Sequence, residues 1–268
     1  MSKVIYEKNY KILHTDSVES WQDVSFQKTA WPIHMKQEKL ANLKAIGWHY
    51  GIPMTKLAVL SYGTSSEESG SPRIITVAES DPLDRTGKDG NAIITNIDDI
   101  VLMGWAADCC LVALSDEAGI TRAIVHCSVE SLASQDIVKK TIRTMDSLYG
   151  VAPLELRAYV GACVRECCYE YDPDKAQNIF GEKYAKHIYV RKDGKTTLDL
   201  NGAVRQALQD AGVKKISNIY DSNCQCTICS KDKNGKFKFH SYRRETCEDR
   251  EGKLVHYNGQ YGLMIGRI

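Results

Sequence analysis

The sequence predicts a single α/β unit that spans residues 1–268. Short apolar runs rich in β-branched residues alternate with three stretches whose apolar residues recur at helical spacing. Polar segments rich in glycine, serine and aspartate separate these runs. With 268 residues and 43% hydrophobic content, the chain is long enough to bury a substantial core.

The N-terminal third begins with residues 1–30, which are polar and are expected to be irregular. Residues 37–50 predict an amphipathic helix, because Leu40, Leu43 and Ile46 share one face. The following apolar runs predict three strands, and the polar segments between them predict two loops. The strands are residues 56–62, 73–78 and 91–95, and the loops are residues 63–71 and 81–90.

Two helices and a strand are predicted in the second half of the chain. Residues 133–148 carry apolar side chains at helical spacing and are followed by Gly150, a typical helix C-cap. Residues 154–160 predict a strand, and residues 198–211 predict another helix that ends before Gly212.

Composition excludes several function classes. The net charge is only +1, so no electrostatic case exists for binding nucleic acid or an anionic membrane. The N-terminus lacks the apolar stretch of a signal peptide, and no apolar run has the length of a membrane span. Ten cysteines in such a chain indicate reduced thiols, so we expect a cytoplasmic protein.

The segment around Cys109 and His126 carries the most chemical information. Two β-rich runs, one after Cys109 and one ending at His126, flank the turn at residues 116–119 and predict a hairpin. Such a hairpin brings the two side chains together at one end of a sheet. A neighbouring Cys and His form either a thiolate–imidazole pair or part of a zinc site, although a buried structural Cys and His is the plainer alternative.

Four motifs together resemble one protein family. They are Ala107-Asp108-Cys109, His126, the run Gly161-Ala-Cys-Val-Arg-Glu-Cys-Cys-Tyr-Glu170, and Phe239-His-Ser-Tyr-Arg-Arg244. This combination resembles the laccase-domain family, the YfiH-type polyphenol oxidase proteins also called peptidoglycan editing factors. The resemblance covers about residues 30–268 and leaves residues 1–30 as an N-terminal extension. It implies central β-sandwich-like sheets flanked by helices, a fold shared with bacterial cysteine deamidases.

The resemblance also implies a zinc site and a purine nucleoside substrate. In the family, zinc is held by the Cys of Ala-Asp-Cys, by a His that opens a His-Ala-Gly-Trp-Arg-Gly motif, and by an upstream His. Cys109 and His126 match the first two ligands, but Thr64 or Gly70 stands where the upstream His is expected. His240 is the candidate substitute, so the expected metal ligands are Cys109, His126 and His240.

Further departures affect the phosphate end of the expected pocket. After His126 the chain reads Cys-Ser-Val-Glu, so the arginine of the family motif is absent, and the N-terminal Thr-Arg-x-Gly-Gly element is also missing. Because phosphate recognition favours guanidinium donors, these losses weaken the case for phosphorolysis.

A second group of cysteines lies outside the Cys109–His126 hairpin. Cys226-x-x-Cys229 has the spacing of half a structural zinc site, although a structural or redox-neutral role is the simpler interpretation. The resemblance places Cys167 and Cys168 in a loop beside the pocket, where we expect one or the other to pack, with contact to the ligand as the alternative.

Three functions are compatible with these residues. The first is a zinc-dependent enzyme for phosphorolysis, hydrolysis or deamination of purine nucleosides, with Asp108 orienting or exchanging a proton and with Arg243 and Arg244 binding substrate. The second is a metal-free hydrolase or deamidase with Cys109 as nucleophile, His126 as base, and Ser128 or backbone amides near the oxyanion. The third is an inactive paralogue that only binds a small molecule.

Overall fold

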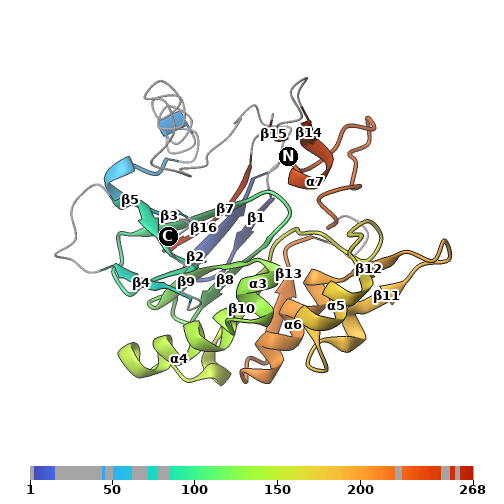
Figure 1. Cartoon of the computed structure of the whole chain (residues 1–268). Coiled ribbons are helices and arrows are strands. Elements are labelled where there is room, and N and C mark those ends of the chain that lie inside the picture. The colour runs from blue at the N-terminus through green and yellow to red at the C-terminus, as the bar shows by residue number, and fades with distance from the viewer. Residues whose placement is uncertain are drawn as a thin grey trace.

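The architecture is two stacked six-stranded sheets with helices packed on one side (Figure 1). The structure, a computed structural model, describes residues 3–15, 44–45, 51–61, 72–77, 85–220, 225–248, 254–256 and 260–267. The prediction of an α/β fold with central β-sandwich-like sheets flanked by helices is confirmed.

The first sheet joins the two ends of the chain, because the strand nearest the C-terminus lies between N-terminal and central strands. Its order is β1-β2-β16-β7-β3-β5, and the pairings of β3 with β7 and β5 are parallel. The strands are β1 (Lys3–Tyr6), β2 (Tyr10–His14), β3 (Leu57–Ser61), β5 (Arg85–Asp89), β7 (Val101–Ala106) and β16 (Tyr261–Arg267).

The second sheet contains the hairpin predicted around Cys109 and His126. Its order is β13-β10-β8-β9-β6-β4, with parallel pairs at its two edges. The strands are β4 (Ile74–Val77), β6 (Ala92–Thr95), β8 (Cys110–Ser115), β9 (Arg122–Cys127), β10 (Arg157–Val160) and β13 (Lys215–Asn218). The turn between β8 and β9 contains Gly119 at φ +73°, a backbone conformation that favours glycine.

A shared hydrophobic core holds the two sheets together. Alternate residues of the facing strands meet in it, including Leu111 and Ile124 from the second sheet and Leu102 and Leu263 from the first. The opposite face of β8 and β9 is also buried, against helices. Burial on both faces explains why β8 reads as a continuous apolar run rather than an alternating one.

The helices cover the outer face of the second sheet (Figure 1). They are α3 (Val129–Ala133), α4 (Ile137–Tyr149), α5 (Pro173–Phe180) and α6 (Leu200–Asp210). In α4, Ile137, Val138, Ile142 and Met145 are buried at helical spacing, and Gly150 caps the helix in the left-handed conformation. The predicted helices over 133–148 and 198–211 are confirmed with shifted boundaries.

The other elements contained in the described ranges are short and lie around the sheets. They are the 3-10 helices η1 (Met54–Lys56), η2 (Pro153–Glu155) and η3 (Ala185–His187), the strand pairs β11 (Ile188–Val190) with β12 (Thr196–Leu198) and β14 (Thr246–Glu248) with β15 (Leu254–His256), and the helix α7 (Tyr242–Glu245).

Two predictions about irregular segments were wrong. Within residues 1–30, β1 and β2 form strands because β2 pairs with β16, about 250 residues away, which no local pattern reveals. Within the predicted loop 81–90, β5 is a polar strand that gains its hydrogen bonds from parallel pairing with β3. Of the helix predicted over 37–50, residues 44–45 are helical and the rest lies outside the described residues.

No helix in the described ranges combines the length and the apolar character needed to cross a membrane.

Candidate functional site

The hairpin of β8 and β9 places Cys109 and His126 on the same face of the sheet. Leu111 lies directly opposite His126 in the antiparallel register, and Cys109 precedes Leu111 by two residues. Because strand side chains alternate, Cys109, Leu111 and His126 point toward the first sheet. Cys109 packs against the core between the sheets, whereas its neighbour Cys110 is buried in the core under the helices. The pair therefore shares one face, diagonally across two strands.

The two side chains differ in how the protein affects their ionisation. Burial lowers the pKa of His126 to about 3, so the imidazole is neutral at physiological pH. A neutral imidazole can accept a proton or ligate a metal ion. Cys109 is half-buried, and its backbone carbonyl accepts a hydrogen bond from Tyr261 Oη at 2.8 Å. The backbone around Cys109 is thus held in place while the residue as a whole stays partly exposed.

Asp108 is buried, and its carboxylate joins three segments. One oxygen accepts a hydrogen bond from Thr227 Oγ1 at 2.6 Å, and the other accepts from Ser241 Oγ at 3.0 Å and from the backbone N–H of Arg243 at 2.8 Å. The residue has φ +88°, which is uncommon outside glycine. These contacts indicate that Asp108 positions the turn before Cys109.

Arg243 lies beside aromatic side chains near Cys109. Its guanidinium carbon is 4.8 Å from the ring centroid of Tyr169 and 5.9 Å from that of Tyr171. Burial and the neighbouring Cys109 thiol raise the pKa of the Tyr169 hydroxyl. Arg243 is exposed and also lines a surface groove of about 640 Å³ with Lys175 and Lys195 among its walls.

The guanidinium of Arg244 is hydrogen-bonded to other groups of the protein. It donates to the carbonyl oxygens of Thr227 and Ile228, each at 2.8 Å, and to the carbonyl oxygen of Phe239 at 2.6 Å. It also donates to Glu245 Oε1 at 2.5 Å. Of the two arginines predicted to bind substrate, only Arg243 has an exposed guanidinium beside Tyr169.

Two other predicted site residues are engaged elsewhere. Ser128 is the N-cap of α3, and its hydroxyl oxygen accepts a hydrogen bond from the N–H of Ser131 at 3.0 Å. His240 Nδ1 lies 3.3 Å from Glu245 Oε2. The structure does not group His240 with Cys109 and His126 as a set of metal donors.

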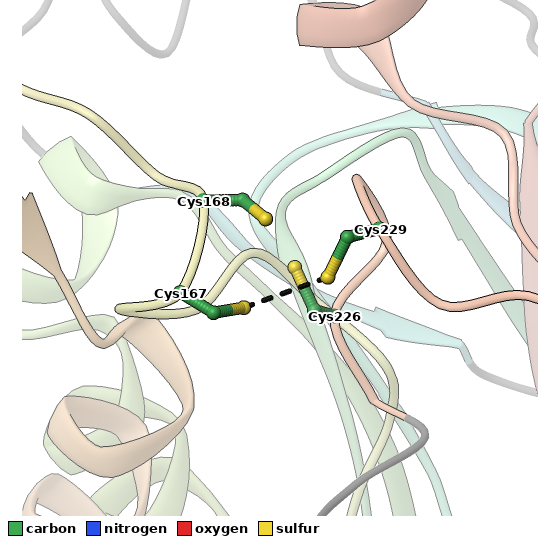
Figure 2. Close-up of side chains that lie close together, drawn as sticks. All are labelled: Cys167, Cys168, Cys226 and Cys229. Atoms are coloured by element: carbon green, nitrogen blue, oxygen red, sulfur yellow. Dashed lines mark hydrogen bonds between the residues drawn. The ribbon is translucent and has the colours of Figure 1, made fainter.

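Metal-binding capacity differs sharply between two places in the described ranges. Cys109 and His126 offer a thiolate and an imidazole, both good zinc donors, but among the described residues no third His, Cys, Asp or Glu completes a group with them. A catalytic zinc ion takes three protein ligands. By contrast, Cys167, Cys168, Cys226 and Cys229 bring four sulfur atoms to one point (Figure 2).

A buried histidine near the Cys109 turn was missed in the sequence. His14, at the end of β2, stacks on Tyr261 with ring centroids 5.2 Å apart, and Tyr261 holds the carbonyl of Cys109. Gly161 lets the two groups approach closely, since a Cβ at this position would lie 3.0 Å from Leu111 O and 3.1 Å from His14 Nε2. Burial lowers the pKa of His14 to about 4. A His directly after the apolar pair Ile12-Leu13 is the signal that could have drawn attention to it.

Comparison with protein families identifies the class of protein that this fold and site belong to. The family described as multi-copper polyphenol oxidoreductase laccase matches residues 54–258. The chain therefore belongs to the laccase-domain family.

Curated relatives within this class share one name. The chain is 31% identical over 157 residues to a purine nucleoside phosphorylase of Clostridium acetobutylicum. The aligned region covers 59% of this chain and 62% of that protein. It is 26% identical over 160 residues to a purine nucleoside phosphorylase of Borreliella burgdorferi, covering 59% and 64% of the two chains. The chain thus spans about three fifths of the length of the curated relatives it matches.

Solved structures confirm the fold. YfiH of Bacillus licheniformis superposes with a TM-score of 0.70 at 21% identity, covering 96% of this chain and 92% of that one. Protein NMB0706 of Neisseria meningitidis gives a TM-score of 0.71 at 19% identity, covering 100% and 98%. At these identities the likeness establishes the architecture alone.

Proposed function

We propose that this protein is an enzyme that acts on small, nucleoside-like substrates and that Cys109 and His126 form its reactive pair. The placement of both side chains on one face, at the same end of β8 and β9, carries the proposal. The name purine nucleoside phosphorylase, shared by three relatives, supports the substrate class.

Residues around the pair supply binding and orientation in this proposal. Tyr169 offers an aromatic face near Cys109, and Arg243 lies over that ring with its guanidinium exposed. An aromatic ring and a guanidinium suit a planar base and a polar sugar or phosphate, respectively. Asp108 acts as a positioning residue, since both of its oxygens accept hydrogen bonds from the surrounding protein.

Cys109 and His126 are also the two side chains at this site that could ligate zinc. If zinc binds here, Cys109 and His126 hold it, and the ion supplies a Lewis acid or an activated water. His126 is suited to ligation because burial keeps its ring neutral.

A second candidate function follows from the same two side chains. A thiol and an imidazole on one face of a sheet are sufficient for a cysteine hydrolase or deamidase, with Cys109 as nucleophile and His126 as proton acceptor. In that case the reaction needs no metal, and backbone amides would stabilise the oxyanion.

A product assay on purine nucleosides tests the proposal and separates the candidates. Adenosine, inosine and guanosine are incubated with the protein, with and without inorganic phosphate, and with and without added zinc. Phosphorolysis yields a sugar phosphate, hydrolysis yields free sugar, and deamination yields ammonia with the glycosidic bond intact. Turnover of any of these that Cys109→Ala abolishes supports the proposal. Turnover that Cys109→Ala leaves unchanged, or a folded protein that processes none of them, contradicts it.

A further inference from the structure

Four cysteines from two distant turns meet at one point outside the Cys109 site. Cys167 and Cys168 lie in a turn after β10, and Cys226 and Cys229 lie in a turn after β13. Figure 2 shows the four sulfur atoms pointing toward a common centre. The sulfur atoms all lie within 4.8 Å of one another. We propose that Cys167, Cys168, Cys226 and Cys229 bind one structural zinc ion.

The distances between sulfur atoms fit a metal site rather than disulfides. Cys167 Sγ lies 3.6 Å from Cys229 Sγ. A disulfide requires about 2.05 Å. Four sulfurs arranged tetrahedrally at about 2.3 Å from zinc are about 3.8 Å apart. The observed separation is therefore close to the edge of a zinc tetrahedron and far from a covalent bond.

The backbone below the cysteines fixes the two turns relative to each other. Cys163 and Cys226 form a parallel bridge in which the N–H of Cys163 donates to Gln225 O at 3.1 Å and the N–H of Thr227 donates to Cys163 O at 3.2 Å. The N–H of Cys168 donates to Arg165 O at 3.0 Å, which closes the first turn. The four thiols are thus brought together before any ion binds, which reduces the entropy lost on binding.

Three arginine side chains donate hydrogen bonds to backbone carbonyls in or next to the two cysteine turns. Arg191 donates to Cys167 O at 3.5 Å, Arg243 donates to Glu170 O at 3.2 Å, and Arg244 donates to Thr227 O and Ile228 O at 2.8 Å. Arg191 is also paired with Glu170 and Asp193, and Arg244 with Glu245, so the part these guanidiniums play is to orient the turns that present the ligands.

The set of donors points to a structural role. Four cysteine ligands complete the coordination of zinc and leave no open position for water or substrate. The pair Cys226-x-x-Cys229 has the spacing common in such sites. Thr227, between those two cysteines, donates to Asp108. The ion would therefore hold the turn that supports the loop before Cys109.

Metal analysis in a background without the Cys109 pair tests this site independently of activity. The double variant Cys109→Ser, His126→Ala is purified with zinc in the medium, and zinc per chain is measured by plasma mass spectrometry. We expect one zinc per chain in this background and loss of that zinc when Cys229→Ser is added. Cobalt added to the zinc-free protein is expected to give the intense thiolate-to-cobalt absorption of a four-sulfur site, and Cys167→Ser is expected to weaken it.

Several outcomes would overturn the proposal. A background variant without zinc or cobalt absorption would do so, as would zinc that persists after Cys229→Ser. An intact mass lower by two hydrogens per bridge under non-reducing conditions would show disulfides instead. If Cys229→Ser fails to fold, the cobalt spectrum of the background variant and of Cys167→Ser still decides the question.

Discussion

Thr227 donates a hydrogen bond of 2.6 Å to the carboxylate of Asp108, 119 residues earlier in the chain. This bond ties the turn before β8 to the turn between Cys226 and Cys229. Ser241 and the backbone of Arg243 donate to the same carboxylate. The loop that carries Cys109 is therefore fixed by residues from two other segments.

Removal of the Asp108 carboxylate is expected to destabilise the fold. Asp108→Ala leaves three donors in a buried region without their acceptor, so we expect a loss of about 3 kcal/mol or more in the free energy of unfolding. Thr227→Val removes one donor and is expected to cost about 1–2 kcal/mol. Urea unfolding of both variants checks this, and an Asp108→Ala protein as stable as the wild type would contradict the anchoring role.

Stability is expected to depend on pH through His14. Burial lowers its folded-state pKa from 6.5 to about 4, so the unfolded chain binds the proton more readily. The contribution of the neutral ring is complete above pH 6.5 and is lost as the pH falls toward 4, a change of about 3 kcal/mol.

Denaturant unfolding of wild type and His14→Phe across that pH window measures this contribution. His126 titrates in both proteins, so the informative quantity is the difference between the two curves. The variant is expected to lose less stability than the wild type as the pH falls. Parallel curves would show that His14 is not the titrating group.

The two adjacent arginines are expected to separate stability from substrate binding. Arg244→Ala leaves three backbone carbonyls without a donor and is expected to cost about 2–4 kcal/mol of stability. Arg243→Ala is expected to change stability by less than about 1 kcal/mol, because the side chain is exposed. For any nucleoside that is turned over, Arg243→Ala is expected to raise KM. If the KM of Arg243→Ala equals that of the wild type, Arg243 does not bind the substrate.

Phosphorolysis of adenosine and inosine is expected to be weak. The resemblance to the family implies arginines at the phosphate end of the pocket, and this sequence lacks them. Loss of one charged hydrogen bond to a transferring phosphate costs about 3–4 kcal/mol. Base release measured at several phosphate concentrations is therefore expected to change little with phosphate. Strong phosphate dependence would show that another cation, such as Arg243, has replaced them.

The sequence predicted the Cys109–His126 arrangement because that arrangement is local. A turn at 116–119 and strand alternation are sufficient to place both side chains on one face. The sandwich of two sheets came from the resemblance to the laccase-domain family, since periodicity alone does not show which strands pair. The predicted roles of Arg244, Ser128 and His240 rested on motif position, and their hydrogen bonds became visible only in the folded chain.

Features built from distant segments could not be predicted in the same way. Half of the four-cysteine cluster was recognised from Cys226-x-x-Cys229, but Cys167 and Cys168 come from a turn about sixty residues earlier. Two close cysteine pairs in one chain were the available signal. The strands β1 and β2 were missed because their partner, β16, is at the other end of the sequence.

The claim that Cys109 forms the reactive centre is tested most directly by a matched pair of variants at neighbouring positions. Cys109 faces the space between the sheets with His126, whereas Cys110 is fully buried on the opposite face. The measurement is the initial rate of nucleoside turnover by Cys109→Ala and by Cys110→Ala, each checked for folding. We expect Cys109→Ala to lose about a hundredfold or more in rate and Cys110→Ala to stay within about threefold of the wild type. Equal rates in the two variants would contradict the account.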